Sequence, residues 1–147
     1  MQLLMLGLAA VAGLTMAVQG SLNAALSKVT GLFPATLVVH VLGTILTAIA
    51  IVFHIGDGNL AKITAAPWYT YLGGVLNVLI IAAVAVTIPR LGAASATTAI
   101  IVGQVLTALC IDQLGCFGLN KVPFTWTKLL GLALLAAGAW LLLNVKR

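Results

Sequence analysis

The sequence predicts an all-α fold, a polytopic membrane protein whose core is a bundle of five transmembrane helices. Of the 147 residues, 63% are hydrophobic and only 6% are charged, whereas soluble domains carry about 25% charged residues. Asp57 and Asp112 are the only acids. Five apolar segments also reach, or come close to, the length of about 20 residues with which a helix crosses a bilayer. A water-facing surface of ordinary size cannot be built from this composition, so we expect the chain to lie in a membrane.

The five predicted helices follow one another with short links. They cover residues 3–27, 32–53, 68–88, 91–111 and 129–145. The four prolines fall at the edges of these segments, where a missing N–H is tolerated. The first segment lacks the basic start of a signal peptide, so we expect it to be retained as a span. No link is long enough to form a domain, and residues 1–147 are predicted to be a single membrane-embedded domain.

The basic residues give almost no preference for one orientation. With five spans, three basic residues lie on the side of the N-terminus and four on the other side. The three are Lys62, Lys121 and Lys128, and the four are Lys28, Arg90, Lys146 and Arg147. The positive-inside rule needs a clear excess. Two interpretations therefore remain open: insertion one way, with the C-terminus in the cytoplasm, or insertion both ways with pairing as an antiparallel homodimer, an inverted repeat made from two chains.

Several classes of function are not indicated. The net charge of +5 comes from basic residues scattered singly between apolar segments, whereas a nucleic-acid surface needs them clustered. Cys110 and Cys116 lack the spacing and the partners of a zinc site, and we expect them to be small apolar fillers. No phosphate-binding loop, activated nucleophile or metal cage is recognisable. We therefore predict no enzyme activity, cofactor, metal or nucleic-acid partner.

Polar side chains recur inside the apolar segments, and they are the candidate functional residues. Thr15, Gln19 and Asn23 follow one another at intervals of one helical turn. The others are Thr36, His40, Thr44 and Thr47 in the second segment, Asn77 in the third, and Thr97, Gln104 and Thr107 in the fourth. An amide without a partner is costly in hydrocarbon, so these groups must face protein or a water-filled cavity. They either form hydrogen bonds between helices or line a shared polar interior.

His40 and a stripe of small residues are considered separately. We expect His40 to be neutral and hydrogen-bonded within the bundle, and proton handling or solute contact is the alternative. The first segment also carries small residues at intervals of four, which lets another helix approach closely. These are Ala9, Gly13, Ala17, Ser21 and Ala25.

Asp112 and Arg90 are candidates for coupling or for an ion pair. They lie 22 residues apart at the two ends of the fourth segment, so about 33 Å of helix separates them. A carboxylate at a helix C-terminus opposes the helix dipole and favours a compensating cation. That cation is Arg90 of a second, antiparallel copy or Lys121 of the same chain, and a solvated carboxylate is the third alternative.

In four segments the chain resembles the YdcZ-type bacterial inner-membrane family of the drug/metabolite transporter superfamily. The similarity is carried by "LTMAVQGSLNAALSK", "PWYTYLGGVLNVLII", "PRLGAASA" and "GQVLTALCIDQLG" in this order. The resemblance implies a transporter fold related to the small multidrug exporters, in a multi-pass inner-membrane protein with paired subunits of opposite topology. It implies no particular substrate. Those exporters carry a Glu in their first helix, where this chain has only the amides of Gln19 and Asn23.

The leading hypothesis is a secondary transporter that moves a small organic solute by alternating access. The candidate solute-binding residues are Gln19, Asn23, His40, Asn77 and Gln104. The absence of a deep carboxylate favours a neutral or anionic solute over a cation. A small dual-topology channel and a non-transporting accessory subunit are the alternatives. The expected partners are the solute, the lipid bilayer, and a second copy or a homologous subunit.

Reporter fusions at the C-terminus test the orientation. Because the basic residues divide three against four, a reporter that works only in the cytoplasm and one that works only outside it should both give a signal. Each is fused after residue 147 and its activity is measured in cells. A signal from only one of the two reporters would contradict dual topology.

Overall fold

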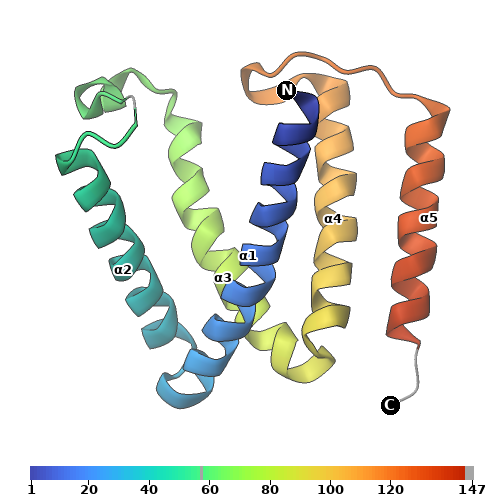
Figure 1. Ribbon diagram of the computed structural model, residues 1–147, viewed down its shortest axis with the longest axis horizontal. Coiled ribbons are helices and arrows are strands. Elements are labelled where there is room, and N and C mark those ends of the chain that lie inside the picture. Colours follow the sequence, from blue (N-terminus) through green and yellow to red (C-terminus); the bar gives the residue numbers. More distant parts are fainter. Residues whose placement is uncertain (57, 145–147) are drawn as a thin grey trace. The chain divides into compact units, whose positions relative to one another are not determined.

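The computed structural model describes residues 1–56 and 58–144. In this part of the chain, five long helices follow one another and no strand occurs (Figure 1). They are α1 (Gln2–Thr30), α2 (Leu32–Val52), α3 (Leu72–Leu91), α4 (Ala93–Leu114) and α5 (Trp126–Leu143). Each is long and apolar enough to cross a membrane, α3 together with the residues Trp68–Tyr71 that precede it. The predicted all-α fold with five membrane-length helices is therefore confirmed, whereas the antiparallel dimer stays a prediction.

The links from α1 to α2 and from α3 to α4 are even shorter than the sequence predicts, whereas the link from α2 to α3 is longer. A single glycine separates α1 from α2, and another separates α3 from α4. Gly31 and Gly92 adopt φ angles of 91° and 86°, a backbone region that side chains with a Cβ disfavour. Because these glycines reverse the chain by themselves, Lys28 and Arg90 lie in the last turns of α1 and α3.

The chain divides into two compact units, residues 1–90 and 91–147. That the two together make one membrane-embedded domain stays a prediction. In the second unit, α4 packs against α5. The link between them, which includes the 3₁₀ helix η3 (Cys116–Gly118), folds back on the end of α4. There the N–H of Val122 donates to the carbonyl of Asp112 over 2.9 Å, and the N–H of Phe124 donates to Oε1 of Gln113 over 2.8 Å.

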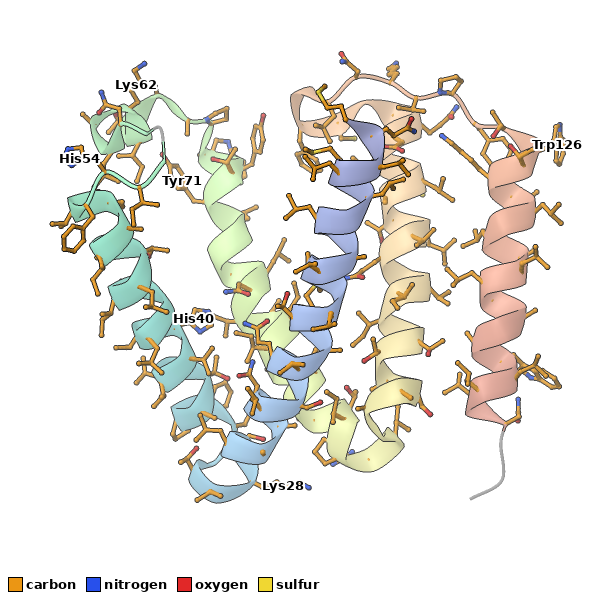
Figure 2. The ribbon with its side chains drawn as sticks, in the orientation of Figure 1. Lys28, His40, His54, Lys62, Tyr71 and Trp126 are labelled. Atoms are coloured by element: carbon orange, nitrogen blue, oxygen red, sulfur yellow. The ribbon has the colours of Figure 1, made fainter. Side chains whose placement is uncertain are left out.

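In the first unit, the buried residues of the three long helices all lie toward the Lys28 end. They are Gly20, Asn23 and Ala24 of α1, Ala35 and Thr36 of α2, and Ile81 and Ala85 of α3. Most of them are small, which lets neighbouring backbones approach closely. At the opposite end, the 3₁₀ helices η1 (Leu60–Ala65) and η2 (Trp68–Tyr71) connect α2 to α3 beside His54 and Lys62 (Figures 1 and 2). The helices of this unit thus pack together at one end, and α1 and α2 make the most extensive contact.

The close contact between α1 and α3 is made at Gly20, which is not part of the predicted stripe of small residues. A Cβ atom built on Gly20 would lie 2.9 Å from Cγ1 of Val84 and 3.1 Å from Cδ1 of Ile88, so α1 and α3 touch at this glycine. Around Gly13, by contrast, nothing lies within 4 Å of such an atom, and Ala9 and Ala25 are exposed. The spacing of small residues predicts that a helix can be approached, but it does not show where the neighbour lies.

Replacing Gly20 by leucine should separate α1 from α3. The new side chain has no room beside Val84 and Ile88, and overpacking of this kind costs about 1–3 kcal/mol of unfolding free energy. Gly13→Leu is the matched control on the same helix, because the space around Gly13 is open. Titration of the purified protein with a denaturing detergent measures both. Equal effects of the two substitutions would show that the contact at Gly20 is unimportant.

Candidate functional site

A polar groove lies between the helices of the first unit, next to their closely packed end. Its volume is about 320 Å³, near the lower limit of about 300–1,000 Å³ for small-molecule sites. The polar side chains of its lining come from α1, α2 and α3. They are Gln19, His40, Thr44, Thr47 and Asn77. Hydrogen-bonding groups from three spans thus meet here around an open volume.

His40 is the central side chain of the groove, and it projects from α2 toward α3 (Figure 2). Its Nδ1 lies 2.8 Å from the carbonyl oxygen of Thr36. A carbonyl can only accept, so Nδ1 carries the proton. Its Nε2 lies 3.1 Å from Nδ2 of Asn77, which is a donor, so Nε2 presents its lone pair. The imidazole is therefore the neutral Nδ1–H tautomer, and it joins α2 to α3.

Two threonines continue the groove along α2. Thr44 donates its hydroxyl proton to the carbonyl of His40 over 2.8 Å, and Thr47 donates to that of Gly43 over 2.9 Å. Such bonds within a helix satisfy a hydroxyl without a partner from another element. They leave the lone pairs of the hydroxyl oxygens available to a guest. The two threonines are missing from the solute-binding residues predicted from the sequence, although their spacing from His40 places all three on one face of a helix.

The two amides of α1 lie in different surroundings. Gln19 is exposed and lines the groove. Asn23, one turn further along α1, has 7% of its surface exposed and lies among the buried residues of the packed end. Its side chain is not part of the groove lining. The two amides are one turn apart on the same helix, but Gln19 is in an open position and Asn23 is in a buried one.

The remaining candidates lie elsewhere. Gln104 is exposed on α4, in the second unit. Asp112 is half-buried near the end of α4, and its carboxylate makes no ion pair with Lys121 or with any other residue in the described part of the chain. Arg90 lies in the last turn of α3. Lys146 and Arg147, which enter the charge count, lie outside the described residues. The structure thus brings together Gln19, His40 and Asn77.

Two other cavities offer less to a solute inside the membrane. One, of about 450 Å³, lies where the chain leaves α2, and it is lined by loop residues together with His54 and Lys62. The other, of about 370 Å³, lies in the second unit and has an almost wholly apolar lining that includes Leu109, Cys110 and Leu132. The first lies beyond the end of the span, and the second provides hardly any hydrogen-bonding group.

Five membrane-length helices, three of which line a polar groove, define the class of polytopic membrane proteins. The family described as "Putative inner membrane exporter, YdcZ" matches residues 4–141, and the chain belongs to this family. No curated protein and no solved structure matches the chain. The chain is thus a multi-pass inner-membrane protein with a role in membrane transport. This confirms the resemblance seen in the sequence.

Nitrogen NMR on protein labelled with ¹⁵N-histidine tests the geometry at His40. The spectrum should show Nδ1 protonated and Nε2 as an acceptor. Asn77→Leu should shift the Nε2 resonance and leave Nδ1 protonated. It should also lower the unfolding free energy by about 0.6 kcal/mol, the average for hydrogen bonds between transmembrane helices, and by at most about 1.7 kcal/mol. The second histidine, His54, is assigned with His54→Gln.

Thr47→Val serves as the control, because Thr47 lines the same groove but does not bond to the imidazole. It should leave both nitrogen resonances of His40 where they are. If Asn77→Leu does not move the Nε2 resonance either, α2 and α3 are not joined by this hydrogen bond.

Proposed function

We propose that the protein exports a small organic solute as a secondary carrier, by alternating access, and that the groove of the first unit is its solute site. The supporting observation is that the groove contains the unit's converging polar side chains and borders a closely packed contact. Gln19 lines the groove, and the next residue, Gly20, lies in the contact between α1 and α3. A solute at Gln19 therefore reaches a closed end of the unit.

The packed end has the properties of a closed gate. Its buried polar side chains are those of Asn23 and Thr36, and no charged side chain is buried there. Ala24, Ala35 and Ala85 have at most 4% of their surfaces exposed. Small residues pack closely without interlocking, so their contact can open and re-form when helices rock against each other. Opening this end and closing the other would carry the solute past the contact.

The His40–Asn77 hydrogen bond lies on the groove side of this gate. It is a single bond of 3.1 Å between α2 and α3, and single bonds between transmembrane helices contribute little to stability. A solute that replaces Asn77 at Nε2, or that binds to the amide of Asn77, can therefore exchange one hydrogen bond for another. Solute binding and the separation of α2 from α3 would then occur in the same step.

In the same proposal, two copies pair in opposite orientations. The nearly even distribution of basic residues supports this. The amides of Gln19 and Asn77 are also exposed on the first unit, and in a bilayer such groups need protein or water beside them. In an antiparallel pair, Asp112 of one copy is on the same membrane face as Arg90 of the other. These two residues remain the candidates for coupling.

Export from proteoliposomes tests the proposal with a mixture of candidate solutes instead of a single chosen compound. Vesicles that contain the purified protein are loaded with a small-molecule extract of bacterial cells, and mass spectrometry identifies compounds that leave faster than from protein-free vesicles. Asn77→Leu and Gln19→Leu should each reduce that export by about tenfold or more, which corresponds to about 1.4 kcal/mol of lost interaction. Asn120→Leu, in the exposed link before α5, is the matched amide control.

The rate of export distinguishes the alternatives. A carrier saturates as the internal concentration of the solute rises, and it exchanges labelled for unlabelled solute. Export that rises without limit indicates a channel. If no compound leaves faster than from protein-free vesicles, the purified protein does not transport by itself, and the carrier proposal fails.

A further inference from the structure

We infer that the groove selects an uncharged solute that carries both hydrogen-bond donors and hydrogen-bond acceptors. This inference rests on the proposed function, because it names the class of solute that the same groove would carry. It narrows the alternatives that the sequence leaves open, since a missing acid disfavours a cation but does not distinguish an anion from a neutral compound. Three properties of the lining carry the inference: its charge, its free hydrogen-bonding groups and its size.

The groove lining contains no residue of fixed charge. Its members besides His40 are amides, hydroxyls, a glycine and aliphatic side chains. Lys28 lies in the last turn of α1 and Lys62 in the link between α2 and α3 (Figure 2). Arg90, the third described basic residue of the first unit, lies in the last turn of α3. No acid is found in the lining. An ion of either sign would therefore find no opposite charge beside it.

His40 is the one titratable side chain of the lining, and in the observed arrangement one ring nitrogen donates and the other accepts. Nδ1 donates to the carbonyl of Thr36, and Nε2 accepts from the amide of Asn77. A second proton on Nε2 would face the N–H of that amide and lose this bond. The groove as a whole thus carries no net charge in this arrangement.

A charged solute would lose much more than a neutral one on entering such a groove. Removal of an ion from water into a membrane interior is very costly unless an opposite charge lies beside it. A neutral polar solute gives up only its hydrogen bonds with water, and the groove can replace these. The lining therefore disfavours both cations and anions, by the same mechanism.

The groove offers free donors as well as free acceptors. The amide of Gln19 has no hydrogen bond to any described residue, so its carbonyl and its NH₂ are both available. Asn77 uses one amide proton on His40 and retains its carbonyl and its second proton. Thr44 and Thr47 contribute only lone pairs, because their protons are bound to carbonyls of α2. Hydroxyl and amide groups complement this set.

The volume and the apolar part of the lining limit the solute further. The cavity of about 320 Å³ is small for a ligand site. Val39 and Ile81 contribute aliphatic surface beside the polar groups. A compact molecule with a few hydroxyl or amide groups on a short carbon skeleton fits these properties.

Labelling of single cysteines with three reagents of similar size tests the inference. Thr47→Cys, in a chain that also carries Cys110→Ala and Cys116→Ser, is reacted in nanodiscs with hydroxyethyl, trimethylammonium-ethyl and sulfonatoethyl methanethiosulfonate. These are neutral, cationic and anionic, and intact-mass spectrometry gives the rates. Each rate is divided by the rate of the same reagent at Thr70→Cys, in exposed η2. At Thr47→Cys, both charged reagents should be at least tenfold slower than the neutral one. If either charged reagent keeps pace with it, the inference is wrong.

Two further variants separate charge selection from solubility in lipid. Leu46→Cys lies on an exposed apolar part of α2 and should react with none of the three reagents, because a thiol in hydrocarbon does not ionise. Gln19→Glu, added to Thr47→Cys, places one carboxylate in the groove with little change of shape. It should speed the cationic reagent at least tenfold and leave the anionic one slow. Unchanged rates would show that the charge of the lining does not select, and would overturn the inference.

The export experiment gives an independent result. Compounds released by the unaltered protein should be uncharged at neutral pH. Release of an ion, with transport intact, overturns this inference and leaves the proposed function standing. If no compound is released, the proposed function fails, and the labelling rates still decide whether the groove selects against charge.

Discussion

The inability of hydrocarbon to form hydrogen bonds is the constraint on which the rest of this structure depends. It requires each span to be a helix, because only then are the backbone groups paired within the segment. It also explains the threonines, whose hydroxyls donate to carbonyls of their own helices, as at Thr15, Thr87 and Thr98. Three of the longer polar side chains, those of Gln19, His40 and Asn77, instead lie together between the helices of the first unit.

The groove of the first unit lies next to the end at which its helices pack together. Gly20 lets α1 touch α3, and buried alanines bring the three helices together beside it. Beyond this contact lie the longer side chains of Gln19, His40 and Asn77. A polar group next to a tight contact, instead of within it, keeps free hydrogen-bonding capacity. Packing and polarity thus divide the unit into a closed part and a part that can receive a guest.

The chemistry of the groove differs from that of a carboxylate-based exporter. In this chain the first helix provides the carboxamide of Gln19, and the imidazole of His40 has both nitrogens in hydrogen bonds. In the function that we propose, recognition depends on neutral donors and acceptors, which are weaker than charges but exchange partners readily. A carrier benefits from this, because a solute that is bound too strongly is not released. The same absence of charge connects the composition of the chain to the class of solute that we infer.

The sequence by itself determined the all-α class, the five spans, the family and the polar residues from which a site could be made. These follow from length, hydropathy and local spacing, which the bilayer and the helix geometry translate directly into structure. Only the tertiary structure decided which polar residues meet. Spacing gives the face of each helix but not its rotation against a neighbour. For that reason Asn23 is buried, Gln104 belongs to another unit, and His40 pairs with Asn77, 37 residues away.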